Sequence, residues 1–273
     1  MPNWITSPQN PQLKQAVRLR DRRSRDELGL CLIDGIRETT RAIEAGVHLE
    51  KLLVCGDPLA QPRFETLLGR AEQAGAAVLY LPEALFAKVA YGDRHDGLVA
   101  VAQTPNCDWN TWQPAEFSRL VVLEGVEKPG NIGAVFRSAD AAGLSGVILT
   151  DLATDIYNPN AIRASLGTLF SLPVVSKSAK ETLAWLVEHG YRIFAARVDG
   201  ALEYTQARYE EPYAFVLGSE AHGLSETWRQ PGVTGVFLPM LGHADSLNVS
   251  ATAVVLFYEA LRQRAGAVVR SAT

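Results

Sequence analysis

Three segments in the second half of the chain carry polar side chains in patterns that could do chemistry. The first, EKPGNIGAVFRSADAAG at residues 127–143, places Asn131 near the start of a predicted helix and Arg137 more than a turn later. Asn131 could simply cap this helix, and Gly143 is a typical helix end. Arg137, however, lies off the apolar face, and an amide and a guanidinium beside the end of a strand could hold a phosphate or a ribose.

The other two segments follow later predicted strands. FVLGSEAHGL, residues 215–224, leads from a strand into Gly218, whose missing side chain would let a ligand approach the backbone, and then to Glu220. A tight turn explains the same glycine equally well. LPMLGHADSLNVS, residues 238–250, leads into the last predicted helix. Ser246 could be only the N-cap of that helix, whereas Asn248 is unfavourable in a helix interior unless its amide has a partner.

Alternating strands and helices must position these side chains. The predicted strands of the second half are nearly continuous apolar runs at 120–123, 146–150, 192–196, 213–217 and 235–238. Such runs, separated by helices, are typical of a parallel sheet covered on both faces, with ligands at the carboxyl ends of the strands. The last predicted helix runs from 247 to 264.

A smaller α/β unit precedes this half and begins with one predicted polar helix from Pro11 to Leu28. Between the two units, residues 104–116 hold two prolines and two tryptophans without periodicity, which indicates a linker. The 273 residues, of which 47% are hydrophobic, suffice for two folded cores. We therefore predict an N-terminal domain at 1–104, a linker at 105–117 and a C-terminal domain at 118–273.

Several common nucleotide and metal motifs are absent from the sequence. The GxxxxG spacing from Gly125 to Gly130 is followed by Asn131 and Ile132, where a phosphate-binding P-loop needs Lys and Ser or Thr. No GxGxxG follows a predicted strand, which argues against a Rossmann dinucleotide site and against Rossmann-type methyltransferases. HExxH and GxSxG do not occur, and the three cysteines form no CxxC pair. We expect no metal.

The sequence predicts a cytoplasmic location. Its longest uninterrupted hydrophobic runs are short, at 76–81 and 253–258, whereas a membrane span needs roughly 20 residues. The N-terminal MPNWITSPQN has neither the cationic flank nor the apolar stretch of a secretory signal. The expected environment is therefore reducing and free of membrane.

Positive charge is concentrated near the N-terminus, although the whole chain has a net charge of −4. Between Gln12 and Arg25 the only acid is Asp21, and the basic residues are Lys14, Arg18, Arg20, Arg22, Arg23 and Arg25. This basic strip could neutralise several phosphates of a nucleic acid. On composition alone, a solvated helix face explains it as well.

The three segments resemble the signature motifs of the SpoU-type (TrmH-like) RNA ribose 2′-O-methyltransferases of the SPOUT superfamily. The resemblance lies in their residues and their order, which is Asn131 with Arg137, then LGSE at 217–220, then LPM with SLNVS at 246–250. The resemblance covers essentially the whole second half. Residues 33–54, IDGIRETTRAIEAGVHLEKLLV, also look like the family's N-terminal substrate-binding domain, whose fold is similar to that of a ribosomal RNA-binding protein.

This resemblance implies a parallel α/β domain with a trefoil knot that forms the cleft for S-adenosylmethionine, and a homodimer. The positions matching those assigned to catalysis and RNA placement are Arg137, Asn131, Glu220, Ser246 and Asn248. The expected cofactor-binding residues are Gly218, Leu238, Met240 and Leu247. RNA binding is expected from Arg18, Arg20, Arg22, Arg23, Arg37, Arg41 and Arg163.

The base that removes the proton of the 2′-hydroxyl stays open. The family proposal makes Arg137 the base, but arginine is effectively always protonated in proteins. The alternative is that Arg137 stays cationic and holds a phosphate, while the proton leaves through Ser246 or water.

The resemblance implies an RNA substrate, because DNA lacks the accepting hydroxyl. The N-terminal domain and the basic strip favour ribosomal RNA over transfer RNA. Two other functions predict a different sequence. A non-catalytic RNA-binding protein would be expected to lose a motif residue, and a small-molecule methyltransferase would not need the N-terminal domain.

Overall fold

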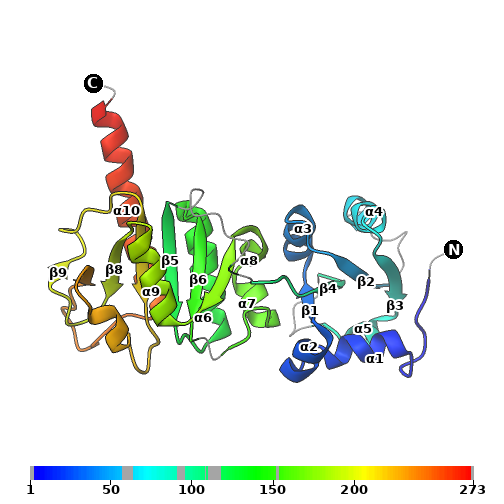
Figure 1. Ribbon diagram of the computed structural model, residues 1–273. Coiled ribbons are helices and arrows are strands. Elements are labelled where there is room, and N and C mark those ends of the chain that lie inside the picture. The colour runs from blue at the N-terminus through cyan, green and yellow to red at the C-terminus, as the bar shows by residue number, and fades with distance from the viewer. Residues whose placement is uncertain are drawn as a thin grey trace. The chain divides into compact units, whose positions relative to one another are not determined.

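The computed structural model describes residues 3–56, 64–90, 96–107, 109, 118–151 and 154–271, and for 266–271 only the backbone. The chain forms two compact units (Figure 1). Unit 1 comprises Met1–Asn106 and Asp155–Ser171, and unit 2 comprises Cys107–Thr154 and Leu172–Thr273. Residues 155–171 thus pack with the N-terminal unit although they follow it far along the chain. Most of the predicted linker 105–117 lies outside the described residues, and the predicted domain limits stay a prediction.

Unit 1 is built on a four-stranded mixed sheet with the strand order β1-β4-β2-β3. Its strands are β1 (Leu30–Asp34), β2 (Leu49–Cys55), β3 (Ala77–Leu81) and β4 (Leu98–Gln103). Strand β4 is antiparallel to both of its neighbours, and β2 is parallel to β3. Alternate residues of β1 and β4, such as Leu32 and Val101, join one apolar cluster, as expected for side chains that alternate between the two faces.

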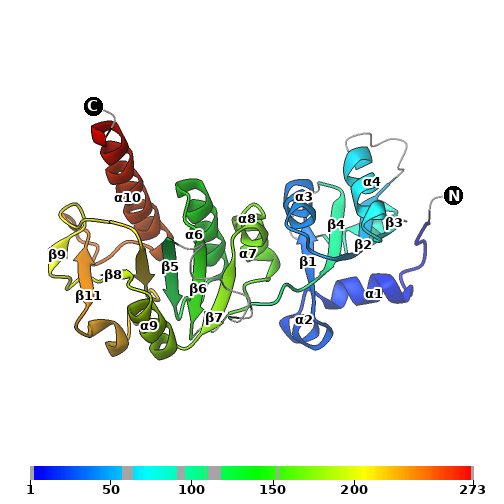
Figure 2. The ribbon, with the colours of Figure 1, turned by 45° about the horizontal axis from the view of Figure 1, so that its top comes forward.

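Helices cover both faces of this sheet. They are α1 (Pro11–Arg18), α2 (Arg22–Leu28), α3 (Ile36–Glu44), α4 (Glu65–Gln73), α5 (Glu83–Phe86), α7 (Pro159–Ala164) and α8 (Thr168–Ser171). Helices α1 and α2 lie on one side and α3 and α4 on the other (Figures 1 and 2). Helix α7 packs against β1, and α8 packs against α3.

The prediction of one helix from Pro11 to Leu28 is wrong. The chain breaks after α1, where Leu19 is buried, and Asp21 then accepts a hydrogen bond from the backbone N–H of Ser24 at 3.2 Å. An aspartate in this position is a strong N-cap and starts a new helix, α2.

Unit 2 contains the expected parallel sheet, in the order β7-β6-β5-β10-β8-β11-β9. The strands are β5 (Arg119–Glu124), β6 (Gly146–Thr150), β7 (Val174–Lys177), β8 (Arg192–Ala196), β9 (Leu202–Glu203), β10 (Tyr213–Leu217) and β11 (Val233–Phe237). Every strand pair is parallel. The two strands that the sequence did not predict, β7 and β9, are short and only partly buried. The knot implied by the resemblance stays a prediction.

Helices also cover both faces of the second sheet. Helices α6 (Pro129–Ala142) and α10 (Val249–Ser271) pack against each other on one face, and α9 (Ala179–Glu188) with the 3-10 helix η5 (Glu226–Arg229) covers the other (Figure 2). Strands β5, β6 and β7 follow one another outward on one side of the sheet, and the four later strands lie on the other side of β5. The connections therefore change direction between β5 and β10, and a ligand is expected at the carboxyl ends of the strands near this point. No helix in the described ranges is long and apolar enough to cross a membrane.

Candidate active site

A cavity of about 530 Å³ lies in unit 2 at the carboxyl ends of β8, β10 and β11. Its wall also includes the segment before α10 and the first turn of that helix. The sequence-predicted residues that line it are Gly218, Glu220, Leu238, Met240, Ser246 and Leu247. Its volume is typical of sites that enclose a small organic molecule, for which ~300–1,000 Å³ is usual. All four predicted cofactor-binding residues therefore share one cavity.

Three predicted catalytic side chains meet at the edge of this cavity. Glu220 follows β10, and its Oε1 accepts hydrogen bonds from the Nδ2 groups of Asn131 and Asn248, the latter at 2.8 Å. Asn248 Nδ2 also lies 3.3 Å from Asn131 Oδ1. Lys128 Nζ lies 3.6 Å from the other oxygen, Glu220 Oε2. The structure thus joins the three sequence segments in one polar cluster.

The local backbone leaves both asparagine side chains available for this cluster. Helix α6 starts at Pro129 with Lys128 as its N-cap, so Asn131 lies inside the first turn and does not cap the helix. Asn248 immediately precedes α10, and its Oδ1 accepts from the backbone N–H of Ser250 at 2.9 Å. The alternative in which Ser246 caps the last helix is therefore wrong, and Asn248 combines a capping oxygen with an Nδ2 donated to Glu220.

Gly218 is required by the fold of its own loop. A Cβ atom built at this position would lie 2.3 Å from the carbonyl carbon of Gly223. The chain turns back tightly here, with the Gly223 N–H donating to the Ser219 carbonyl at 2.9 Å and the His222 N–H to Ser219 Oγ at 3.1 Å. Of the two explanations of this glycine, the structure supports the tight turn, which in turn places Glu220.

Glu124, which lies outside the three motif segments, fixes the next part of this loop. It is the last residue of β5, and its side chain is 6% exposed. Its carboxylate accepts from Ser225 N at 2.7 Å, Ser225 Oγ at 2.8 Å and Trp228 Nε1 at 2.9 Å. The only sequence signal was an acid at the end of an otherwise apolar strand. Leu224 and Arg229, on either side of this anchored segment, line the cavity.

Arg137 is exposed on α6 and does not line the cavity. Within the described ranges no hydrogen bond or ion pair holds its guanidinium. The structure therefore brings together four of the five predicted catalytic residues and leaves Arg137 outside the group, and its catalytic role stays a prediction.

The predicted RNA-binding residues fall on two sides of unit 1. Arg18, Arg20, Arg22 and Arg23 are exposed on or between α1 and α2, whereas Arg37 and Arg41 are on α3, across the sheet (Figure 1). On α2 the positive charge of the two arginines is partly compensated by acidic residues one turn later. Arg22 Nε lies 3.5 Å from Asp26, and Arg23 Nε lies 2.8 Å from Glu27.

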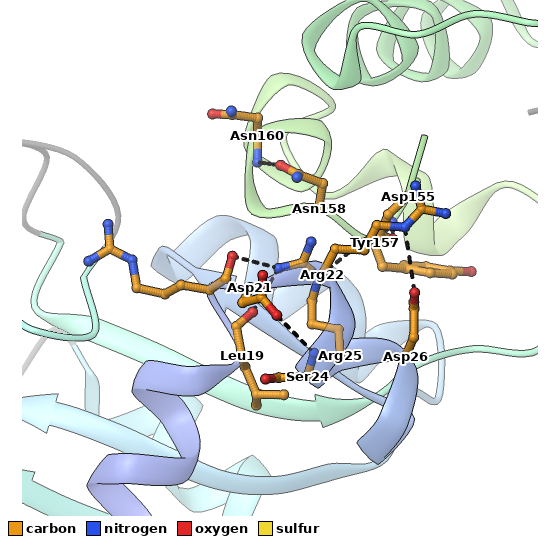
Figure 3. Close-up of polar contacts among 11 residues, drawn as sticks. Leu19, Asp21, Arg22, Ser24, Arg25, Asp26, Asp155, Tyr157, Asn158 and Asn160 are labelled. Atoms are coloured by element: carbon orange, nitrogen blue, oxygen red, sulfur yellow. Dashed lines mark hydrogen bonds and ion pairs between the residues drawn. The ribbon is translucent and has the colours of Figure 1, made fainter. Parts of the chain in front are cut away.

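Arg25, counted in the basic strip, is structural. It is 3% exposed, and its Nε donates to Asp155 Oδ2 at 2.7 Å (Figure 3). Its Nη1 donates to the carbonyls of Leu19 and Arg20, at 2.8 and 2.9 Å. Burial among these acceptors makes the guanidinium inaccessible to RNA, and the contact joins the α1–α2 break to the segment before α7.

Two other predicted RNA contacts lie in the same part of unit 1. Arg41 is half-buried, and its Nη1 donates to the carbonyl of Leu166 at 2.6 Å. Leu166 has a positive φ of 54°, followed by Gly167 at 84°, and a Cβ at Gly167 would lie 2.9 Å from Glu38 Cα. Arg163 is half-buried on α7. Arg41 therefore contributes to holding α3 against the α7–α8 segment.

A second charged group lines the cavity beyond the Glu220 cluster. Arg229 Nη1 donates to Asp199 Oδ2 at 2.7 Å, and Arg197 Nε lies 3.5 Å from Asp199 Oδ1. The hydrogen bond from Arg229 lowers the pKa of the Asp199 carboxyl below its ordinary value, so that the carboxylate is ionised at neutral pH. In the part of the chain that the structure describes, no group of three or more His, Cys, Asp or Glu side chains is placed to hold a metal ion.

Comparison with protein families identifies the class to which this fold and site belong. Residues 118–258 match the model of the SpoU rRNA Methylase family, and residues 10–100 match that of an MRM3-like substrate binding domain. The first match covers more than half of the chain, and the chain belongs to the SpoU rRNA Methylase family.

Individual relatives extend over nearly the whole chain. A 23S rRNA (uridine(2479)-2′-O)-methyltransferase from Streptomyces viridochromogenes is 33% identical over 254 residues, covering 90% of this chain and 87% of the relative. The crystal structure of an RNA 2′-O ribose methyltransferase is 38% identical with a TM-score of 0.80, covering 96% and 99%. An AdoMet-bound rRNA methyltransferase from Sinorhizobium meliloti is 26% identical with a TM-score of 0.86, covering 95% and 97%.

Proposed function

We propose that this protein is an S-adenosylmethionine-dependent methyltransferase that methylates a ribose 2′-hydroxyl of RNA, with ribosomal RNA as its substrate. The observation that carries the proposal is the hydrogen-bonded cluster of Asn131, Glu220 and Asn248 at the edge of a cavity of about 530 Å³. Family membership and the names of the relatives support the same reaction.

The cavity fits S-adenosylmethionine in size and in the chemistry of its walls. Apolar side chains that could enclose an adenine are contributed by Leu217, Val236 and Leu238. Glu220 and Asp245 supply carboxylates for the positive charges of the methionine end. Arg197 Nε is buried without a hydrogen-bond partner among the described residues, as expected for a wall that completes its bonding with a ligand. When bound, S-adenosylmethionine supplies a methyl group that its sulfonium already activates.

The protein's own contribution is then mainly orientation. The two asparagine amides hold the Glu220 carboxylate in one rotamer, while Lys128 offers a cation beside it. A carboxylate fixed in this way gives the edge of the cavity a negative charge, which can hold the positive methionine end of the cofactor in one orientation toward the ribose oxygen. Such positioning can supply up to ~7–11 kcal/mol of the barrier.

Removal of the hydroxyl proton is assigned to a path that does not use Arg137 as the base. Arg137 is exposed on α6 and has no partner among the described residues that could draw off its proton. A cationic Arg137 instead holds the phosphate next to the target ribose, and the proton leaves through Ser246, which lines the cavity, or through water.

Ribosomal RNA is favoured as the substrate by two features of the chain. Residues 10–100 match a substrate-binding domain, and curated relatives with near-complete overlap are named as 23S rRNA 2′-O-methyltransferases. Because the net charge is −4, RNA contacts must be local, and the exposed cations of α1 and α2 provide them. Activity on ribosomal RNA would place the protein in the cytoplasm.

The proposal includes a homodimer. Helix α10 packs against α6 and leaves Val254 at 40% and Tyr258 at 48% exposure. Large apolar side chains of this exposure, beside the helix that carries Asn131, favour burial against a second copy of the chain. Light scattering during size-exclusion chromatography would show twice the chain mass of 29.7 kDa.

The reaction is tested by incubating the protein with labelled S-adenosylmethionine and either ribosomal RNA or transfer RNA, followed by nucleoside analysis. We expect a 2′-O-methylated nucleoside only with ribosomal RNA. Product only on transfer RNA would refute the substrate assignment.

Calorimetric titration with S-adenosylmethionine addresses the non-catalytic alternative. No heat, and no stabilisation against thermal unfolding, would contradict methyl transfer and favour the non-catalytic RNA-binding alternative. Mapping ribose methylation in cells with and without the protein would then identify the nucleotide.

A further inference from the structure

A largely buried guanidinium forms part of the cavity wall away from the Glu220 cluster. Arg197 follows β8 directly, and its side chain is 17% exposed. It lies across Gly235 of β11, where an added Cβ would be 2.5 Å from Arg197 Nη2. The strand therefore has a glycine at the one place where the guanidinium needs room, and both residues belong to unit 2.

The Nε–H of this guanidinium has no acceptor among the described residues. The nearest carboxylate oxygen, Asp199 Oδ1, is 3.5 Å away, and the other oxygen of Asp199 is already bonded to Arg229. A buried N–H without an acceptor has lost its hydrogen bond to water and has formed no other hydrogen bond, which costs free energy. The binding of a ligand that places a hydrogen-bond acceptor beside this N–H is therefore favoured.

The sheet order separates Arg197 from the polar cluster. Glu220 follows β10 and Asn131 follows β5, whereas Arg197 follows β8, on the far side of β10 from β5. Because β8 is the neighbour of β10, Arg197 and the loop that carries Glu220 begin at adjacent strand ends. Its neighbours in the cavity wall are the apolar residues Ala196, Val198, Val236 and Leu238 together with the charged Asp199 and Arg229.

The charges of the cavity orient a ligand that is positive at one end. S-adenosylmethionine carries a sulfonium, an ammonium and a carboxylate at its methionine end, which leaves that end net positive, while its nucleoside end is neutral. The carboxylates of Glu220 and Asp245 attract the positive groups, whereas Arg197 and Arg229 share the single carboxylate of Asp199 and keep the other end of the cavity net positive. The neutral, flat nucleoside also matches the apolar wall beside Arg197.

We propose that Arg197 recognises the nucleoside of S-adenosylmethionine, with its buried Nε–H donating to a ring nitrogen or ribose oxygen. This inference rests on the proposed function and deepens it. It makes Arg197 a cofactor-recognition residue that orients the methionine end toward Glu220.

The test measures binding by calorimetry with two ligands. S-adenosylhomocysteine contains nucleoside and amino acid, whereas 5′-methylthioadenosine lacks the amino acid. Arg197→Met should lower the affinity for both ligands by the same factor, about tenfold, which corresponds to the loss of one charge-assisted hydrogen bond. The control Arg192→Met removes an exposed arginine at the opposite end of the same strand and should leave both affinities unchanged.

A second series separates recognition from a merely structural role. Analogues of 5′-methylthioadenosine that each lack one acceptor, the deaza bases and deoxyriboses, are titrated into wild type and Arg197→Met. One analogue should bind the wild type less tightly than 5′-methylthioadenosine does, because it lacks the acceptor that Arg197 contacts. In Arg197→Met this difference in affinity should disappear. Arg197→Lys should behave like Arg197→Met, because a flexible ammonium does not place a donor at Nε.

The outcomes distinguish this inference from the proposed function. Weaker binding of S-adenosylhomocysteine alone would mean that Arg197 binds the ligand's carboxylate, and penalties unaltered by the variant would mean that it only shapes the cavity. Either result overturns the inference while the proposed function stands. If the wild type binds neither ligand, the proposed function fails as well. Thermal unfolding without ligand verifies that each variant is folded.

Discussion

Glu220 is the residue on which the polar cluster converges. Its Oε1 accepts from two amides and its Oε2 faces Lys128. Glu220→Gln keeps the shape but replaces a charged acceptor by a neutral amide, whose NH2 group would face donors. We expect the rate of methyl transfer in single-turnover experiments to fall ~10²–10³-fold, the range for losing one polar contact made in the transition state.

The control for this substitution is Glu188→Gln. Glu188 is exposed at the end of α9, outside the cavity. It should leave the rate unchanged. A Glu220→Gln enzyme with wild-type rate would show that the cluster does not take part in the reaction.

Arg137 allows a test of the proton path. We expect Arg137→Lys to slow methyl transfer without changing the dependence of the rate on pH, because a cation that only holds a phosphate keeps its charge in both forms. A lysine acting as the base would lose its proton at lower pH than arginine, since their ordinary pKa values are about 10.4 and above 12. A profile displaced toward lower pH in this variant would therefore support the base role.

Among the structural elements, the loop after β10 depends on the buried carboxylate of Glu124. Its three donors come from Ser225 and Trp228, so one side chain of β5 anchors the segment that leads from Gly223 into η5. Glu124→Gln places an NH2 group against these donors. We expect the free energy of unfolding to drop by ~1–3 kcal/mol in urea titrations.

The same substitution should also weaken the binding of S-adenosylhomocysteine, because Leu224 and Arg229, on either side of the anchored segment, line the cavity. Ser225→Ala provides the comparison, since it removes the hydroxyl donor but keeps the backbone N–H. It should cost less stability than Glu124→Gln. Equal stability of Glu124→Gln and wild type would rule out the anchoring role.

In unit 1 the pair of Arg25 and Asp155 joins segments that are 130 residues apart. Breaking a buried pair by removing one partner leaves the other charge uncompensated and costs ~3–5 kcal/mol. We expect Asp155→Asn and Arg25→Met each to lower the unfolding free energy by about this amount. In the double variant the two effects should be clearly less than additive. Additive losses would show that the two side chains act independently.

The sequence predicts the elements that bury continuous apolar runs and misses those fixed by distant partners. The ends of β6, β8 and β10 agree with the prediction, because each is a short apolar run bounded by polar or turn residues. The two-residue β9 has no such run and exists because it pairs with β11. The break between α1 and α2 was missed because the capping role of Asp21 competes with a continuous polar helix.

The candidate site shows the same limit. The order and spacing of the three segments identify Asn131, Glu220 and Asn248, yet the hydrogen bonds that join them span 28 to 117 residues. Glu124 and Arg197 were missed because each acts through partners that only the fold brings near. Arg25 was counted as a surface charge because its partner, Asp155, is equally remote in the sequence.

At the scale of the whole molecule, an acidic protein must concentrate its contacts with an anionic substrate. On α1, Lys14 and Arg18 are exposed one turn apart, and neither has an ion-pair partner among the described residues. On α2, by contrast, Asp26 and Glu27 compensate Arg22 and Arg23. The cations of α1 are therefore the better placed to neutralise phosphates.

The double variant Lys14→Glu with Arg18→Glu should weaken RNA binding more than tenfold while leaving the affinity for S-adenosylhomocysteine unchanged. Each lost phosphate contact makes the negative slope of log affinity against log salt shallower by ~0.7–0.9. The loss of two contacts should therefore reduce the magnitude of this slope by ~1.4–1.8. The matched control, Lys180→Glu with Arg208→Glu, makes the same change in net charge on exposed residues of unit 2. If the control weakens RNA binding as strongly, the effect is one of total charge, and equal loss of RNA and cofactor binding in the first variant would indicate misfolding.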